Sequence, residues 1–295
     1  MMPKFMLDTN LSTQAVNSRT PDKRFIFTIT TGRSGTNFLS ELFALNLDNA
    51  VVHHEQLAYS DWGVNSPDIS HLTTFNHVGN NSHVRAFWEQ KFARLKALEV
   101  SYFAEMSHVL AKAGLVENLD LLQEAGEIHL IYLKRDIAET VISFISRAGF
   151  SNKATMWLWT LDPDYPNVIL SAAPFRNLGQ VGFALWYVLE MRVRAEYCRL
   201  LLAERTGVVF HEVDMKDVTR IMGAANLLAN LGMDLLPEAI KMPGRTNVNT
   251  FPDLDESAKQ HIRDVVKNCA FDAAALARGW YEQGYRLSEF CEVPY

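Results

Sequence analysis

The sequence predicts an α/β fold with three layers, in which helices flank a central parallel sheet. Two observations support this prediction. Strand-sized apolar runs alternate with longer stretches of helical periodicity along the 295 residues, as in strands joined by crossover helices. The run from Glu127 to Leu133 is apolar on both faces, which is typical of a strand at the centre of a parallel sheet. We therefore expect a polar tail over residues 1–23 and one α/β domain over residues 24–295.

The elements of the first half follow from local patterns. β-branched and aromatic residues predict a strand at 24–31, and apolar residues near helical spacing predict a helix at 36–47. Residues 56–83 are rich in Ser, Asn, Asp, Gly and His, so we expect a long loop there. The other elements expected in this half are a strand at 50–54, a helix at 84–98 and a strand at 100–103.

In the second half, the buried strand at 127–133 is followed by a predicted helix. Asp136 and Glu139 form a pattern like a capping box at its start. Residues 151–179 contain prolines and several aromatic residues, which predicts an irregular excursion. The remaining predictions are a long helix at 180–205, a strand at 208–210 and further helices to the end of the chain.

Composition limits the class of protein. The formal net charge of −6 argues against broad nucleic-acid binding, although a local basic pocket is compatible with it. No apolar run approaches the ~20 residues of a membrane helix, and the N-terminus lacks the apolar core of a signal peptide. The three cysteines are too widely spaced for a disulfide framework or a zinc site. We expect a cytoplasmic protein, monomer or homodimer, with a small-molecule substrate and no metal.

The turn over residues 31–37, Thr-Gly-Arg-Ser-Gly-Thr-Asn, lies between a predicted strand and a predicted helix. Such a turn directs backbone N–H groups inward, and the helix dipole adds positive character. Gly32 and Gly35 permit close backbone approach, Arg33 supplies a fixed positive charge, and Ser34 and Thr36 supply hydroxyl groups. The turn therefore predicts a phosphate or sulfate site, although a plain strand-to-helix turn is the alternative.

A second strand, turn and helix has the same character. Arg135 follows the strand at 127–133, and Ser143 lies about two turns into the next helix. A basic residue at the carboxyl edge of a sheet and a hydroxyl on the following helix can bind one phosphate together. The first turn lacks the Gly-Lys-Ser/Thr ending of nucleotide-triphosphatase loops. A nucleotide kinase or another P-loop phosphate-binding protein is therefore the weaker alternative.

The two segments together resemble the soluble, bacterial-type sulfotransferases that use 3′-phosphoadenosine 5′-phosphosulfate (PAPS). In that family a Pro-Lys/Arg-Ser-Gly-Thr-Thr loop binds the 5′-phosphate and sulfonate, and a later Arg and Ser bind the 3′-phosphate. "GRSGTNF" and "RDIAETVIS" match these motifs in the same order, and "VVFHEVDMKDV" is similar to the family's later strand and acidic turn. Gly32 replaces the usual Pro, and Asn37 replaces the second Thr, without loss of charge.

The resemblance implies a P-loop sulfotransferase-like fold and transfer of a sulfuryl group by in-line displacement. The acceptor would be a hydroxyl or amine of a soluble small molecule or of a glycan or glycolipid precursor. Arg33 would stabilise the bridging oxygen, and Arg135 with Ser143 would bind the 3′-phosphate. A module that kept the fold without activity is a further alternative. The residues implied to hold the donor's 5′ end are Thr31, Gly32, Arg33, Ser34, Gly35, Thr36 and Asn37.

The acceptor needs a general base, and two residues qualify. Glu55 follows the second strand in "VVHHEQ" and is similar to a glutamate that is the base in several family branches. His108 lies in "AEMSHVL" and resembles the histidine of the small-molecule branch, but Met106 and Ser107 replace the usual Lys-Thr before it. His53 and His54 could orient Glu55 or contact the substrate.

A late loop, "KMPGRTNVNTF" over residues 241–251, completes the candidate set. In the family a basic residue of such a loop closes over the 3′-phosphate, which makes Arg245 the candidate, with Asn247 and Asn249 as weaker ones. Aromatic residues of the excursion could wall the acceptor pocket, although core packing is the commoner role: Trp157, Trp159, Tyr165, Phe175, Trp186 and Tyr187.

Overall fold

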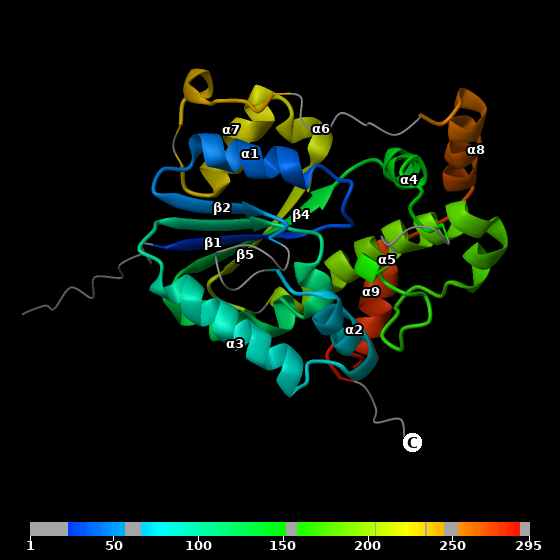
Figure 1. Cartoon of the computed structure of the whole chain (residues 1–295), viewed down its shortest axis with the longest axis horizontal. Helices are drawn as coiled ribbons and strands as arrows, with labels where there is room; N and C mark the ends of the chain where they lie inside the picture. The colour runs from blue at the N-terminus through cyan, green and yellow to red at the C-terminus, as the bar shows by residue number, and fades with distance from the viewer. Residues whose placement is uncertain are drawn as a thin grey trace, which may run out of the picture.

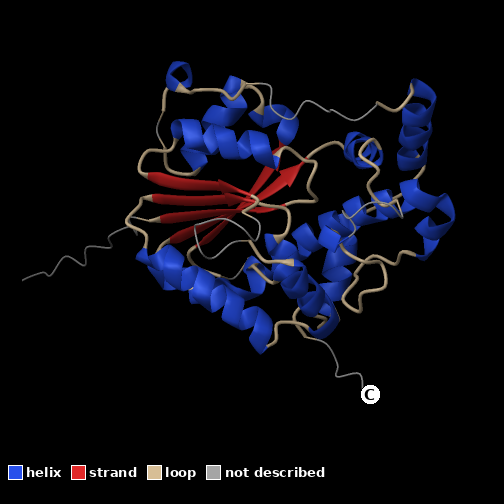
Figure 2. Ribbon diagram, viewed as in Figure 1, coloured by secondary structure: helices blue, strands red, loops and turns tan. Residues whose placement is uncertain are grey.

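The computed structural model describes residues 23–56, 66–151, 158–203, 205–233, 235–244 and 253–289. Within these residues, five strands form one sheet in the order β2-β3-β1-β4-β5, and every neighbouring pair is parallel (Figure 2). The predicted α/β architecture with a central parallel sheet is therefore confirmed. The strands are β1 (Arg24–Ile29), β2 (Ala50–His54), β3 (Tyr102–Met106), β4 (Glu127–Lys134) and β5 (Val208–Asp214).

Helices cover both faces of the sheet (Figure 1). On one face α1 (Thr36–Asn46) and α7 (Ile221–Asn230) share an apolar core with the strands, and α6 (Met215–Val218) leads into α7. On the other face α3 (Ser82–Ala97) and α5 (Gly179–Leu202) pack on a larger, aromatic core. The other helices are α2 (Ile69–Val78), α4 (Ile137–Ile145), α8 (Glu256–Lys267) and α9 (Ala273–Glu282), with 3₁₀ turns η1 (Leu110–Ala113), η2 (Val116–Leu121), η3 (Gln123–Ala125), η5 (Ala173–Leu178) and η6 (Pro237–Ala239).

The predicted loop over residues 56–83 is wrong in its second half. Residues 69–78 form α2, and α3 already begins at Ser82. The Asp68 carboxylate accepts hydrogen bonds from the N–H groups of Ser70 and His71 and so caps α2, while Leu72 and Phe75 are buried. The segment is mostly polar and has only a narrow apolar stripe, so its sequence does not indicate a helix. It forms a helix because this stripe packs against η1 and the core.

Two strand boundaries also differ from prediction. β3 starts at Tyr102 and continues through Met106, so it is shifted along the chain from the predicted 100–103. β5 extends to Asp214, four residues beyond its predicted end, because it pairs with β4 along its whole length. The long helix, α5, ends at Leu202 rather than 205, and the described part of the predicted irregular excursion contains only short 3₁₀ turns.

Among the described residues, none of the helices is both long and apolar enough to cross a bilayer.

The strand order places a crevice beside β1. The connection that follows β1 leads toward the edge strand β2, whereas the connection that follows β4 leads toward β5 at the opposite edge. Ligands of open α/β sheets bind outside the carboxyl ends of the strands at such a reversal. The turn after β1 and the turn after β4 therefore meet at one place.

A buried ion pair on α5 anchors the irregular segment near this crevice. Glu190 accepts hydrogen bonds from the N–H groups of Ile169 (3.2 Å) and Leu170 (2.8 Å) and from Arg194 (2.7 Å). Arg194 also donates to the backbone oxygen of Asn167 at 3.1 Å. Because both charges are satisfied although they are buried, the pair fixes the position of the segment on α5.

A second buried cluster predicts that stability depends on pH. His129 of β4 hydrogen-bonds to His211 of β5 (2.9 Å between Nδ1 and Nε2) and to Glu127 (3.1 Å), which Arg24 also contacts. Burial lowers the pKa of His129 to about 4, with Glu127 opposing and His211 assisting the shift, and burial also lowers the pKa of His211. Below pH ~6.5 these two histidines therefore bind protons in the unfolded chain but remain neutral in the folded chain.

We expect the free energy of unfolding to fall as the pH is lowered from ~6.5 toward ~4, by up to ~1.4 kcal/mol per pH unit for each proton. Urea titrations at several pH values would measure this slope. The double substitution His129→Leu and His211→Leu should reduce this slope without abolishing it, because other histidines with a lowered pKa, such as His108, still contribute. An unchanged slope in that variant would contradict the assignment.

Candidate active site

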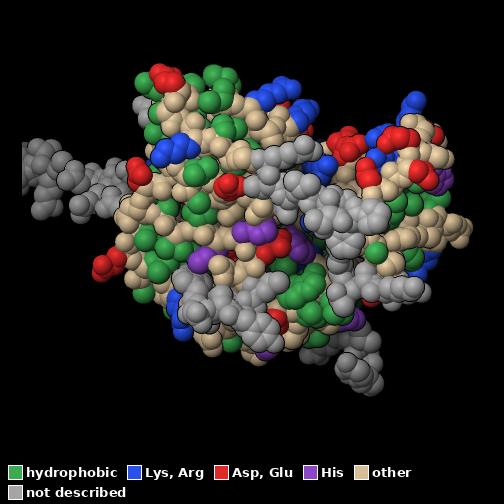
Figure 3. Space-filling view, turned by 45° about the horizontal axis from the view of Figure 1, so that its top comes forward, with side chains coloured by type: hydrophobic (Ala, Val, Ile, Leu, Met, Phe, Trp, Pro, Cys, Tyr) green, Lys and Arg blue, Asp and Glu red, His purple; other side chains and the backbone are tan. Residues whose placement is uncertain are grey.

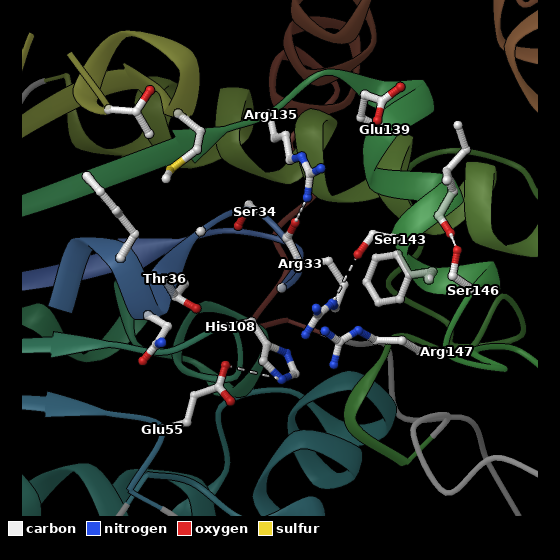
Figure 4. Close-up of a pocket in the computed structure, with 18 of the residues that line it drawn as sticks. Arg33, Ser34, Thr36, Glu55, His108, Arg135, Glu139, Ser143, Ser146 and Arg147 are labelled. Atoms are coloured by element: carbon white, nitrogen blue, oxygen red, sulfur yellow. Dashed lines mark hydrogen bonds and ion pairs between the residues drawn. The ribbon is translucent and has the colours of Figure 1, made fainter. Parts of the chain in front are cut away.

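A cavity of about 1010 Å³ opens at the carboxyl end of β1. Its walls come from the turn after β1, the end of β2, the segment after β3, α4 and α8 (Figure 4). On the face drawn in Figure 3, histidine and acidic side chains gather next to one another near the centre of the molecule. Segments far apart in the sequence therefore contribute charged groups to one site.

The turn after β1 has the backbone geometry of an anion-binding loop. Gly32, Arg33 and Gly35 all have positive φ angles, of 79°, 56° and 104°. Residues in this conformation next to ordinary ones direct successive N–H groups to one side. Gly35 precedes α1 and has no side chain to cap it, and a Cβ atom there would lie 2.2 Å from the Sδ atom of Met215. The turn thus requires glycine at this position and leaves the first N–H groups of α1 for a ligand.

Positive charge is concentrated in the cavity. Arg33, Arg135 and Arg147 all line it, and the side chains of Arg33 and Arg147 point toward each other in Figure 4. Burial, followed by repulsion from Arg147 and, less strongly, Arg135, lowers the pKa of Arg33 to about 10, with Glu55 opposing the shift. Arg33 thus remains charged at neutral pH. Clustering like charges costs free energy that a bound polyanion would offset.

The structure joins the two strand-turn-helix motifs that contain Arg33 and Arg135. Arg33 donates from Nε to the hydroxyl oxygen of Ser143 at 3.3 Å, and Arg135 donates from Nη1 to the backbone oxygen of Arg33 at 3.0 Å. The carbonyl of Arg135 itself accepts a hydrogen bond of 2.8 Å from Arg192 of α5. The turn after β4 is therefore held against the turn after β1, with both facing the same cavity.

Both candidate bases lie at this cavity. Glu55 has a φ angle of 45°, and its N–H donates to the Met106 oxygen at 3.3 Å, so the chain turns sharply at the end of β2. The Oε1 atom of Glu55 lies 3.8 Å from His108 Nε2 and 3.9 Å from His54 Nε2. His54 Nε2 in turn lies 3.0 Å from the hydroxyl oxygen of Thr36. Glu55, His54 and Thr36, the first residue of α1 after the turn, thus form a continuous chain of contacts.

Electrostatics keep His108 neutral. Burial lowers its pKa well below the ordinary value, and the nearby charges of Lys112, His54 and Arg33 lower it further. The His108 side chain is 19% exposed, so it still reaches the cavity. It packs against the turn after β1, since a Cβ on Gly32 would lie 3.1 Å from its Cγ atom.

Not every predicted residue lines the cavity. Thr31 lies outside its lining: its hydroxyl donates to the Gly32 oxygen, and its backbone oxygen accepts from Tyr187 at 2.8 Å. His53 also lies outside the lining and packs against Phe103. The predicted residues that do line it are Gly32, Arg33, Ser34, Gly35, Thr36, Asn37, His54, Glu55, His108, Arg135 and Ser143. Arg245, Asn247, Asn249 and Trp157 lie outside the described residues.

Some lining residues were missed by sequence reasoning. Arg147 lies four residues beyond Ser143, so helical spacing could have indicated that both face the same side. Lys259 and Arg263 of α8 have the same spacing, but only the tertiary structure brings α8 to the cavity. There Lys259 pairs with Asp253, and Arg263 pairs with Glu139. Of the aromatic candidates, Trp159 lines the cavity, whereas Phe175, Trp186 and Tyr187 are buried in the core.

No protein-family model and no curated protein sequence matches the chain. Among solved structures, it is similar to a sulfotransferase from Alicyclobacillus acidocaldarius, with 10% identity, a TM-score of 0.43, and coverage of 90% of this chain and 96% of that one. It is similar to the sulfotransferase domain from the curacin biosynthetic pathway (12%, TM-score 0.43, coverage 91% and 99%). A third is the sulfotransferase domain from the Synechococcus PCC 7002 olefin synthase (15%, TM-score 0.36, coverage 90% and 96%). All three are named as sulfotransferases, the class that the two motifs resemble.

Proposed function

We propose that the protein transfers a sulfuryl group from PAPS to a hydroxyl or amine of a small-molecule acceptor. One observation carries the proposal. Arg33, Arg135 and Ser143, from two separate strand-turn-helix segments, converge on one cavity that also holds the acid–base candidates Glu55 and His108. Anion-binding groups on one side and a proton acceptor on the other are what sulfuryl transfer requires.

The residues of the cavity fit the donor. The turn over residues 32–36 and the N-terminus of α1 would hold the 5′-phosphosulfate, and Arg135 with Ser143 would hold the 3′-phosphate. The donor supplies an activated sulfuryl group whose departure leaves negative charge on the bridging oxygen. Arg33, which is partly buried and charged, is placed to stabilise that charge.

On the acceptor side, Glu55 takes the proton of the attacking group. Its carboxylate lies at the end of β2, at the same sheet edge as Arg33, and is 29% exposed, so a substrate can reach it. His54 and His108 flank this carboxylate, with ring nitrogens 3.9 Å and 3.8 Å from its Oε1 atom. The acceptor then approaches between Glu55 and the turn that binds the donor.

Two measurements test the proposal. Adenosine 3′,5′-bisphosphate at a hundredfold excess over its Kd should stabilise the fold by ~2.7 kcal/mol, and ATP or NAD at the same concentration should stabilise it less. Incubation with labelled PAPS and a metabolite extract should yield a product that has gained one SO₃ group by mass. A protein that binds the bisphosphate and transfers nothing would be a non-catalytic module.

The 3′-phosphate site gives a prediction of its own. Arg135→Ala should weaken the binding of adenosine 3′,5′-bisphosphate by about 1.5–3 kcal/mol, because a charge-assisted hydrogen bond is lost. Adenosine 5′-phosphate, which lacks the 3′-phosphate, should bind the variant and the wild type with similar affinity. Isothermal titration calorimetry with both ligands would measure the difference, and an equal loss for both would argue against a 3′-phosphate role for Arg135.

Activity should survive a chelator. The described residues contain no cluster of three or more His, Cys, Asp or Glu side chains able to hold a metal ion. The turn after β1 also carries Arg33 where magnesium-dependent loops carry Lys. Turnover with PAPS labelled in its sulfuryl group should therefore be the same, within error, with and without EDTA. Loss of turnover that magnesium restores would favour the kinase alternative.

A further inference from the structure

Lys112 is a fully buried lysine directly behind one of the candidate bases. It lies in η1, four residues after His108, and its side chain has no exposed surface. Its Nζ atom lies 2.9 Å from His108 Nδ1 and 2.8 Å from the hydroxyl oxygen of Tyr187, and it also contacts the backbone oxygen of Trp159. A buried ammonium needs all its hydrogens bonded, and here it has three partners.

The direction of these hydrogen bonds can be assigned from the partners. The Tyr187 hydroxyl donates its own hydrogen to the Thr31 carbonyl at 2.8 Å, so its oxygen accepts from Lys112. The Trp159 carbonyl can only accept. The third hydrogen of the Lys112 ammonium is then left for His108 Nδ1, which must be the bare, accepting nitrogen of the ring.

The other side of the imidazole leads to the same assignment. His108 Nε2 lies 3.8 Å from the Glu55 carboxylate, and a bare Nε2 would turn its lone pair toward that negative charge. Nε2–H facing Glu55 is attractive instead. The neutral ring has one proton, so a proton on Nε2 and a bare Nδ1 satisfy both neighbours at once.

We propose that Lys112 is a positioning residue that holds His108 in the Nε2–H tautomer. This inference rests on the proposed sulfuryl transfer. His108 in this tautomer has no free lone pair facing the cavity and cannot accept the acceptor's proton. The proton therefore passes to the Glu55 carboxylate, and the Nε2–H of neutral His108 faces that carboxylate from 3.8 Å away.

The surroundings act in opposite directions on the charge of Lys112. The groups that face His108 are Lys112 of η1, Arg33 of the turn after β1, and His54 and Glu55 at the end of β2. Burial lowers the pKa of Lys112 well below its ordinary value, and Arg194 of α5 lowers it further, whereas Glu55 raises it. The Glu55 carboxylate thus favours both the ammonium of Lys112 and the proton on Nε2.

The tautomer can be measured without any turnover. In protein labelled with ¹⁵N-histidine, His108→Gln identifies the His108 signals by their loss. We expect wild-type His108 at neutral pH to show a protonated Nε2 and an unprotonated Nδ1. A protonated Nδ1 in the wild type would overturn the proposal, because Lys112 would then be an amine that accepts, and His108 would be the base.

Two lysine variants separate positioning from stability. In Lys112→Met, loss of the neighbouring positive charge should raise the pKa of His108, and its tautomers should become mixed. Lys91→Met removes another fully buried lysine, one that pairs with Glu105 at 2.7 Å, and should leave the His108 ring signals unchanged. If Lys112→Met does not fold, the tautomer of His108 in the wild type still tests the proposal. Unchanged His108 signals in folded Lys112→Met would contradict the proposal.

Kinetics distinguish this inference from the proposed function. Lys112→Met should lower kcat at least ~10-fold and change its pH profile, with little change in the KM for the donor. A wild type with the expected tautomer and no sulfuryl transfer would refute the function and leave the Lys112–His108 pairing intact. Sulfuryl transfer by a wild type with a protonated Nδ1 would support the function and refute the positioning role of Lys112.

Discussion

Glu55→Gln should lose at least ~10²-fold in kcat and still bind adenosine 3′,5′-bisphosphate normally. The amide keeps the shape of the side chain but cannot take the acceptor's proton, and a lost general base typically costs 10²–10⁴ in rate. Glu55 lies at the end of β2 within 4 Å of both His54 and His108, so the isosteric change disturbs little else. Steady-state kinetics with labelled PAPS and calorimetry with the bisphosphate would measure the two effects.

Two control variants sharpen this result. Glu282→Gln removes a carboxylate from an exposed position at the end of α9 and should leave kcat unchanged. His108→Ala should be milder than Glu55→Gln, because it removes a neighbour of the base and not the base itself. If Glu55→Gln keeps wild-type rates while His108→Ala folds and is inactive, the two roles are reversed.

Arg33→Ala should lower kcat by ~10³-fold or more, because it removes the charge that faces the developing negative charge of the leaving group. Arg33 is positioned by Ser143 and lies among other cationic residues. Its loss also relieves their mutual repulsion, so the fold should be at least as stable as the wild type. Single-turnover kinetics at saturating PAPS would isolate the chemical step from donor binding.

Arg33→Lys should recover part of the lost rate, since it restores the charge but not the planar guanidinium. Arg278→Ala, at an exposed position of α9, removes an arginine away from the cavity and should retain full activity. Arg33→Ala with near-normal single-turnover rates would show that the bridging oxygen is stabilised elsewhere in the site.

The agreement between sequence and structure is closest where a pattern is local. The strand-to-helix turn around Arg33 was predictable because glycine dihedrals, a charged residue and the onset of helical periodicity all lie within one short segment. The buried strand β4 was predictable from its continuous apolar run. The helix α2 was missed because its stripe is narrow and its remaining residues are polar, so its formation depends on packing against η1.

For the candidate site, too, some features could be predicted from the sequence and others could not. The ends of parallel strands share one sheet edge, so Arg33, Glu55 and Arg135 could be expected at the same side of the sheet from strand order alone. The 3.8 Å approach of Glu55 to His108 could not be expected, because it depends on a sharp backbone turn at Glu55 and on the contact of Gly32 with the imidazole. The helical spacing between Ser143 and Arg147 does indicate that both face the same side.

Residues close together in the chain set the α/β architecture, the turn after β1 and the paired Arg and Ser motif, so all three could be predicted from the sequence. Only the tertiary structure decided which side chains meet across the cavity. Lys112 shows the reason most clearly. Its sequence position in an apolar stretch gives no chemical signal, and its role arises because burial leaves it His108, Tyr187 and Trp159 as the hydrogen-bond partners in place of water.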